Sequence, residues 1–206
     1  AKENLIVDDG SDDGTTEILK NINDKDLKII FHPKNYGKGT AIKTGLKNIT
    51  GDLIIVQDGD LEYEPSEYIK LLHPILNNEA EIVYGSRILG SKNRSYNRYY
   101  WGGRFLSSLT NMLYGSHLTD EPTCYKLFKK KVIDSINLEC KGFEFCPEIT
   151  SKALRIGYKI IEVPISYNPR SMAEGKKIRW YDGLYAIYIL IKNRFTPISK
   201  IYKARI

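Results

Sequence analysis

The amino-acid sequence predicts an α/β fold built on a mostly parallel sheet. Short apolar runs alternate with segments of helical periodicity, which is the order of elements in βαβ units. One of these runs, residues 53–56, is apolar at every position, as in strands buried on both faces of a parallel sheet. The length of 206 residues and the hydrophobic content of 42% fit one domain over residues 1–206 with a full core.

The first half of the chain supplies four of the predicted strands. A helix follows the first strand and begins at Asp13-Gly14-Thr15. Pro65 lies in the first turn of a later helix, where its ring is tolerated. The predicted elements are strands over residues 4–7, 27–31, 53–56 and 82–84, and helices over residues 15–20, 37–47 and from 65 onward.

The second half has more helix and more basic loops. Its predicted elements are a loop over residues 88–97, helices over 99–114, 144–156 and 180–195, a strand over 159–163 and a basic loop over 168–177. One face of the first of these helices carries Trp101, Phe105, Leu109 and Met112. This face and the apolar, basic segment 179–206 either belong to the core or lie at a membrane interface.

The net charge of +6 limits the classes of partner. A basic balance of this size fits phosphate-bearing substrates, an anionic membrane surface or nucleic acid. No apolar stretch reaches the ~18–20 residues that are needed to span a bilayer. The three cysteines are an odd number without paired spacing, which favours a reduced, cytoplasmic protein over a disulfide framework.

Asp58-Gly59-Asp60 is the sharpest candidate site. Two carboxylates that directly follow a buried strand can reach one cation if the chain turns there, and Gly59 permits such a turn. Hard ions such as Mg²⁺ or Mn²⁺ take carboxylate ligands and share their other positions with substrate phosphates. The alternative is an ordinary solvated turn. The position at a strand end, with Glu62 nearby, favours the metal site.

A second polar cluster follows the first strand. Asp8, Asp9 and Ser11 lie in a loop with two glycines, and their oxygens suit the hydroxyls of a ribose or the edge of a base. The alternative is an acidic helix start, capped by Asp13 or Thr15. The fourth strand ends near Arg87. Ligands of parallel sheets bind beyond the carboxyl ends of the strands, so these clusters mark one candidate site.

Together these segments resemble the family 2 glycosyltransferases of the GT-A fold, and among them the enzymes that transfer mannose or glucose to dolichyl or polyprenyl phosphate. The matching segments cover nearly the whole chain in the family's order. They are IVDDGSDDGT (6–15), NYGKGTAIKTGL (35–46), QDGDLEYEP (57–65), YGSR (84–87), LTDEPTCYKLF (118–128), GFEFCPEIT (142–150) and EVPISYNPRSMAEGKKI (162–178).

The resemblance implies a role for each candidate residue. The nucleoside would be contacted by Asp8, Asp9, Ser11 and Asp58, and the metal would be bound by Asp58 and Asp60, with Glu62 beside them. Substrate phosphates would be bound by Arg87, Arg170, Lys176 and Lys177. Catalysis would involve Asp120, Asp60 and Arg87, with Asp120 near the donor sugar or the acceptor.

The resemblance also implies a reaction. A hexose would pass with inversion from GDP-mannose or, as a close second, UDP-glucose to a polyprenyl or dolichyl phosphate, with Mg²⁺ or Mn²⁺ as cofactor. The enzyme would lie peripherally on the cytosolic face of a membrane and bind no nucleic acid. The family begins with a further strand and a P-x-Y/F-N-E segment, which this sequence lacks. Without that inner strand we expect two unpaired strand edges and no activity of this chain alone.

Three alternatives remain open at this point. A transferase of the same fold could use a saccharide or protein hydroxyl as acceptor, with Asp120 as the base. A nucleotidyltransferase would share the sheet and the carboxylates, but would carry a glycine-rich basic loop near its start, which this sequence does not show. A nucleotide-sugar-binding scaffold without turnover would keep the fold alone.

Overall fold

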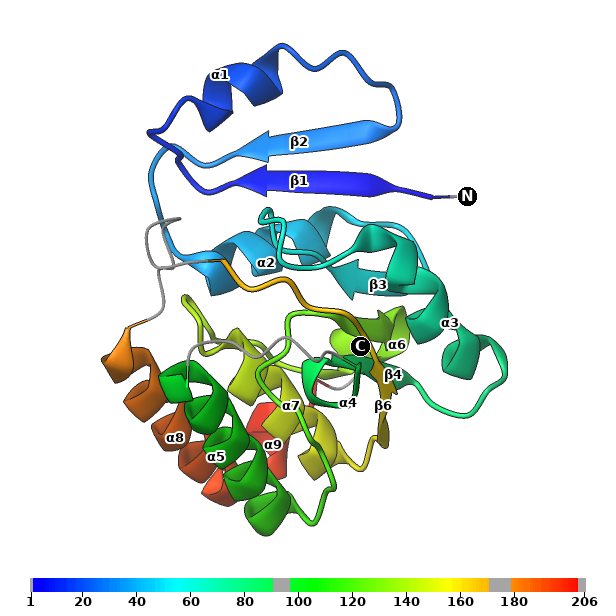
Figure 1. The fold of residues 1–206 in the computed structure, drawn as a ribbon, viewed down its shortest axis with the longest axis vertical. Coiled ribbons are helices and arrows are strands. Elements are labelled where there is room, and N and C mark those ends of the chain that lie inside the picture. The colour runs from blue at the N-terminus through cyan, green and yellow to red at the C-terminus, as the bar shows by residue number, and fades with distance from the viewer. Residues whose placement is uncertain (1, 91–96, 171–178, 204–206) are drawn as a thin grey trace.

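The computed structural model describes residues 2–90, 97–170 and 179–203, and it has the α/β fold that the sequence predicts (Figure 1). β1 (Asn4–Asp8) and β2 (Leu27–Phe31) pair in parallel, and α1 (Thr15–Lys20) connects them. α2 (Lys38–Asn48) follows and packs against β1, where the side chains of Leu5 and Val7 approach Gly45.

A second sheet has the strand order β3-β5-β4-β6. These strands are β3 (Leu53–Val56), β5 (Lys126–Lys129), β4 (Ile82–Ser86) and β6 (Ile160–Pro164). β5 is antiparallel to both β3 and β4, so β3 and β4 run in the same direction, and β6 is parallel to β4. The carboxyl ends of β3, β4 and β6 therefore lie at one edge of the sheet.

Alternating side chains of this sheet enter two apolar layers. Ile82, Tyr84 and Phe128 point to a cluster that also contains residues of α6 (Lys130–Ser135) and α7 (Phe145–Ile156). Val83 and Leu127 point to the other face, where α3 (Tyr68–Leu76) packs. The buried apolar area on both faces fixes the register, because a shift by one residue would expose it.

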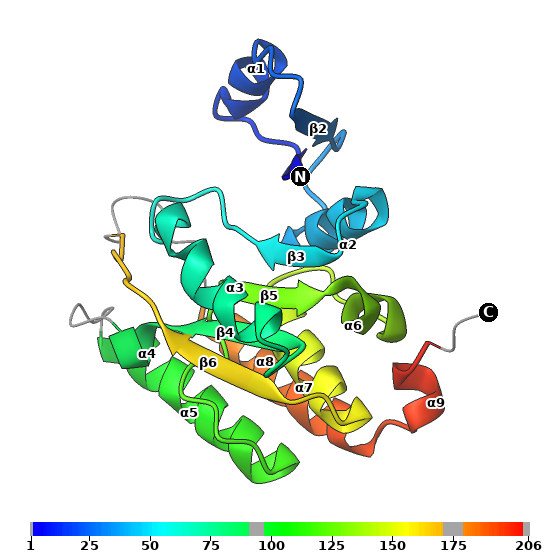
Figure 2. The same ribbon diagram turned by 90° about the vertical axis from the view of Figure 1, so that its right-hand side faces the viewer.

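The remaining helices lie mostly on the side of α7 (Figure 2). They are the short η1 (Pro65–Glu67) before α3, α4 (Arg87–Gly90), α5 (Asn97–Tyr114), α8 (Trp180–Phe195) and α9 (Ile198–Ile201). α8 contacts both α5 and α7. In the described part of the chain, no helix combines the length and the apolar character that a bilayer crossing requires.

Most predicted elements are confirmed, and the differences include two short helices, α6 and α9, that were not predicted. Residues 88–90, predicted as loop, continue the short helix α4. β5 was not predicted, because only two apolar residues lie between its lysines, yet Lys126 is fully buried. The described strands also form two sheets instead of one: β1 and β3 are each the last strand of their sheet, and each has one edge without a strand partner among the described residues.

Candidate active site

Asp58 follows β3 at the carboxyl edge of the sheet, and its carboxylate is held from two sides. The Lys38 Nζ atom lies 2.7 Å from Asp58 Oδ1, and the Cys124 thiol donates to Asp58 Oδ2 at 2.6 Å. Burial alone would lower the pKa of Lys38, but the acidic groups of Cys124 and Asp58 raise that pKa well above its usual range. Lys38 therefore stays charged beside Asp58.

Asp60 and Glu62 share a second cation, Arg170. The Arg170 guanidinium donates to Asp60 Oδ2 at 2.9 Å, and the Arg170 backbone N–H donates to Glu62 Oε1 at 3.1 Å. Burial raises the pKa of Asp60, and the negative charges of Asp58 and Glu62 raise it further, against the effect of Arg170. The buried Arg170 Nε atom makes no hydrogen bond among the described residues, but it lies 3.6 Å from Glu62 Oε1 as part of an ion pair. The region thus concentrates negative charge around one guanidinium.

The fit to a metal ion depends on two carboxylates. Within residues 2–90, 97–170 and 179–203, no group of three His, Cys, Asp or Glu side chains could hold a metal ion. Glu62 accepts bonds from Tyr167 and Arg170 instead of completing a cluster with Asp58 and Asp60. Asp58 and Asp60 suit Mg²⁺ or Mn²⁺ when substrate phosphates supply further ligands, so the donor chemistry fits the predicted cofactor.

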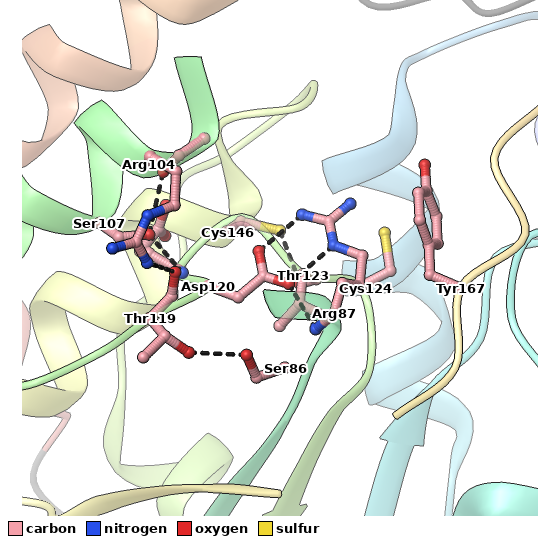
Figure 3. A network of polar contacts seen from close by, with 12 residues as sticks. Ser86, Arg87, Arg104, Ser107, Thr119, Asp120, Thr123, Cys124, Cys146 and Tyr167 are labelled. Atoms are coloured by element: carbon pink, nitrogen blue, oxygen red, sulfur yellow. Dashed lines mark hydrogen bonds and ion pairs between the residues drawn. The ribbon is translucent and has the colours of Figure 1, made fainter. Parts of the chain in front are cut away.

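Arg87 and Asp120 form a bidentate ion pair at the same edge of the sheet as Asp58 and Asp60 (Figure 3). Arg87 Nε and its backbone N–H donate to Asp120 Oδ2 at 2.7 and 2.9 Å, and Arg87 Nη2 donates to Oδ1 at 2.7 Å. Burial alone would lower the pKa of Arg87, but Asp120 raises it well above its usual range. Because both oxygens of Asp120 are bonded to a guanidinium, Asp120 is better placed to hold Arg87 than to accept a proton.

The segment before Asp120 is fixed by a strand and a helix. Glu162 of β6 accepts the backbone N–H groups of Thr119 and Asp120 at 2.7 and 2.8 Å, and the Thr119 hydroxyl at 2.8 Å. The Arg104 guanidinium of α5 donates to the Thr119 carbonyl oxygen at 2.9 Å. These bonds set the position of Asp120 and, through it, of Arg87.

Tyr167 connects the two halves of the site. Its ring centroid lies 5.0 Å from the guanidinium carbon of Arg87, a cation–π contact. Its hydroxyl donates to Glu62 Oε2 at 3.1 Å. Figure 3 shows Arg87 between Tyr167 and Asp120. One continuous set of contacts therefore runs from Glu62 through Tyr167 to Asp120.

The acidic loop after β1 is held by its own side chains. Asp8 Oδ1 accepts the Ser11 backbone N–H at 3.1 Å and the Ser11 hydroxyl at 2.5 Å. Asp9 accepts the backbone N–H groups of Tyr36 and Gly37 at 3.0 and 2.7 Å, which ties the loop to the start of α2. Asp8, Asp9 and Ser11 thus lie in one fixed loop, and their contact with a nucleoside stays a prediction.

Sequence reasoning missed Lys38, Cys124, Glu162 and Tyr167 as residues of the site. Lys38 carried a signal, because it lies between two glycines at a helix start. Gly37 has a φ of 95°, and a Cβ atom there would lie 2.5 Å from the Lys141 carbonyl oxygen, so a larger residue would disturb this start.

Two predicted phosphate-binding residues, Lys176 and Lys177, lie outside the described residues. Arg170, which precedes them, is described and contacts Asp60. The structure therefore brings Asp58, Asp60, Arg87, Asp120 and Arg170 to one edge of the sheet. It adds Lys38, Cys124, Glu162 and Tyr167 as their partners.

The fold and this site define a glycosyltransferase of the GT-A class. The family model described as glycosyl transferase family 2 matches residues 1–136. This chain belongs to that family.

Three curated proteins are among its relatives. The UDP-N-acetylglucosamine–dolichyl-phosphate N-acetylglucosaminyltransferase of Methanococcus voltae is 33% identical over 84% of this chain and 78% of its own length. The dolichol-phosphate mannosyltransferase of Pyrococcus furiosus is 30% identical over 92% of this chain, and the low-salt glycan biosynthesis hexosyltransferase Agl6 of Haloferax volcanii is 27% identical over 92%. The chain spans about half the length of the last two, 55% and 45%.

Solved structures of similar fold include the glucosyl-3-phosphoglycerate synthase of Mycobacterium tuberculosis. Its complex with Mn²⁺, uridine diphosphate and phosphoglyceric acid has a TM-score of 0.70 and 16% identity over 96% of this chain and 69% of that one. Its complex with phosphoglyceric acid alone has a TM-score of 0.68 and 19% identity over 96% of this chain and 70% of that one. At these identities the similarity shows the shared fold.

Proposed function

We propose that this chain transfers a sugar from a nucleoside diphosphate to a polyprenyl phosphate such as dolichyl phosphate. The proposal rests on the cations that surround the carboxylates at the sheet edge: Lys38 at Asp58, Arg170 at Asp60, and Arg87 beyond Tyr167. Cationic donors that face one region suit two phosphorylated substrates, a diphosphate donor and a phosphate acceptor. The names of two curated relatives, which include dolichyl or dolichol phosphate, support this acceptor.

The donor sugar is the finer part of the proposal. GDP-mannose is our first choice and UDP-glucose the second, on the resemblance to mannosyl- and glucosyltransferases. The relative of highest identity among the three described uses UDP-N-acetylglucosamine by its name, so this donor joins the candidates. All three donors carry the same diphosphate, and the described cations recognise that shared group.

The reaction forms a bond between an acceptor phosphate oxygen and C1 of the sugar, and breaks the bond between C1 and the donor diphosphate, which leaves with the electron pair. Direct displacement inverts the configuration at C1. A phosphate monoester has a second pKa of about 6, so the acceptor is already ionised at neutral pH and needs no base. This agrees with an Asp120 whose oxygens are both bonded to Arg87. A hydroxyl acceptor would need a free base, which the bonded Asp120 does not offer.

A divalent cation held by Asp58 and Asp60 would stabilise the negative charge that develops on the leaving diphosphate. Lys38 and Arg170 lie next to these carboxylates and would bind diphosphate oxygens there. Arg87 would orient the acceptor phosphate, since Asp120 and Tyr167 hold its guanidinium in place.

The test is a transfer assay. Purified full-length protein, with any residues that precede Ala1, would be incubated with Mn²⁺ or Mg²⁺ and dolichyl phosphate in detergent. Labelled GDP-mannose, UDP-glucose or UDP-N-acetylglucosamine would be offered separately. We expect label in the lipid phase for one donor, released nucleoside diphosphate in equal amount, and loss of both with EDTA. Transfer only to hydroxyl acceptors would overturn the lipid-phosphate acceptor. Binding of the nucleotide sugar without cleavage would favour a scaffold without turnover. Release of pyrophosphate from a nucleoside triphosphate would favour a nucleotidyltransferase.

Lys38→Met tests the cation that the sequence reasoning missed. Because Lys38 is a partly buried charge at the proposed diphosphate site, its loss should weaken nucleoside diphosphate binding about tenfold, the equivalent of ~1.4 kcal/mol. Titration calorimetry with Mn²⁺ present measures this affinity. Lys47→Met is the matched control, since Lys47 is an exposed lysine in the last turn of the same helix. Equal affinities for the two variants would remove Lys38 from the proposed site.

A further inference from the structure

The outer face of α8 is apolar, although it is exposed. Ala186, Ile189, Leu190 and Asn193 are the buried residues of this helix, and they form its inner stripe. The opposite side carries Leu184, Tyr188, Ile191 and Phe195 at the spacing of one helical face, with exposed fractions of 57%, 55%, 44% and 79%. Trp180 at the start of the helix is 78% exposed. A helix on a water-facing surface would carry polar residues on this side.

α5 also carries exposed apolar side chains on one face. Trp101, Phe105 and Met112 lie on one face at helical spacing, and their exposed fractions are 65%, 57% and 75%. Of the two alternatives left open for this face, the core and a membrane interface, the core is excluded for these three side chains. α5 packs against α8, and Figure 1 shows the two helices side by side on the part of the molecule away from β1 and β2. Two neighbouring helices thus carry exposed apolar and aromatic stripes, which we call the α5–α8 surface.

The charges around this surface are mostly positive, although Lys192 is paired with Glu139 at 3.2 Å. Residues 179–203 contain five basic residues, Arg179, Lys192, Arg194, Lys200 and Lys203, and one acidic residue, Asp182. Residues 99–117 of α5 and the turn after it contain Arg104 and no Asp or Glu. Trp and Tyr side chains with nearby Lys and Arg are the composition of segments that lie at a lipid–water interface.

We infer that the α5–α8 surface docks on an anionic lipid bilayer. The aromatic and aliphatic side chains enter the interface of the leaflet, and the basic residues contact the anionic headgroups. The surface adjoins the site, because Arg104 of α5 bonds to the Thr119 carbonyl oxygen next to Asp120. This inference deepens the proposed function and rests on it: a polyprenyl phosphate acceptor stays in the bilayer, and the docked enzyme meets its headgroup beside Arg87.

The charges favour a bilayer over a second copy of this chain as the occupant. In a symmetric dimer the same patch would face itself, so the five basic residues of each copy would meet those of the other. An anionic leaflet carries the opposite charge, so it attracts these basic residues where a second copy of the chain would repel them.

The test compares two double variants in vesicle flotation. Phe105→Ser with Leu184→Ser removes one exposed apolar side chain from each helix of the surface. Ile69→Ser with Leu76→Ser removes two exposed apolar side chains from α3 and is the matched control, with exposed fractions of 73% and 68%. We expect the first variant to bind phosphatidylcholine–phosphatidylglycerol vesicles about tenfold more weakly than wild type and the control to bind as wild type. Binding of the wild type should weaken at high salt and without phosphatidylglycerol.

The outcomes separate docking from the proposed function. Equal flotation of both variants would overturn the inference. A second result would also overturn the inference: the wild type sediments as a dimer, the surface variant sediments as a monomer, and neither protein binds vesicles. Sugar transfer to a dolichyl phosphate in detergent reports the proposed function independently of docking. We expect the surface variant to lose more transfer to acceptor embedded in vesicles than to acceptor in detergent. Equal losses would argue against a docking role.

Discussion

Asp60→Asn is expected to lower kcat for sugar transfer about 10²–10³-fold, the usual cost of removing one group that stabilises developing charge. The substitution keeps the size of the side chain and removes its negative charge. In the structure this charge is one of two carboxylates that suit a divalent cation, and Arg170 donates to it. The loss should appear in kcat at saturating donor, because the charge on the leaving diphosphate is greatest in the transition state.

Asp52→Asn is the control for Asp60→Asn. Asp52 lies before β3 and its side chain is exposed, so this variant should keep the wild-type kcat. Removal of the metal with EDTA should reduce wild-type transfer to the level of Asp60→Asn and leave the variant almost unchanged. A variant that regains wild-type kcat at high Mn²⁺ would show that Asp60 affects only metal affinity.

Breaking the Arg87–Asp120 pair is expected to destabilise the fold strongly. Asp120→Asn leaves the Arg87 guanidinium without its counterion, and Arg87→Met leaves a carboxylate that is only 3% exposed. Removing one partner of a buried pair typically costs about 3–5 kcal/mol. We expect a loss of this size in the free energy of unfolding for each single variant, measured by urea denaturation.

The double variant tests whether the pair acts as a unit. Combining Asp120→Asn with Arg87→Met should cost less than the sum of the two single losses, since no unpaired charge remains. Lys130→Gln is the control, because Lys130 and Asp134 form a partly exposed pair at 3.4 Å that should contribute less than about 1 kcal/mol. Additive losses for Arg87 and Asp120 would mean that the two side chains are not coupled.

The sequence predicted the strands that end in site residues well, because their signals are local. The apolar run before Asp58 and the glycine-rich loop after β1 each identify a strand and its end. The parallel course of β3, β4 and β6 brings those ends to one edge, as expected from alternating strands and helices. The antiparallel β5 was missed because its apolar pattern is too short and its buried lysine resembles a surface residue.

The partners of the site residues could not be read from the sequence. Lys38 meets Asp58 across 20 positions, and Cys124 meets the same carboxylate across 66. Glu162 accepts the Asp120 backbone N–H across 42 positions. Nothing in the sequence of its strand distinguishes Glu162 from an ordinary solvent-facing glutamate. Such contacts depend on how the elements pack. The same limit applies to α5 and α8, whose apolar stripes alone do not tell core from exposed surface.

The bond between Arg170 and Asp60 spans 110 positions of the chain, which bears on how the protein is made. During synthesis the acidic segment leaves the ribosome long before the arginine that neutralises it, so the complete site can form only after Arg170 has been made. Contacts of such long range also close slowly, since much of the chain must be ordered first. A product of synthesis that stops before Arg170 would carry the two aspartates without this cation.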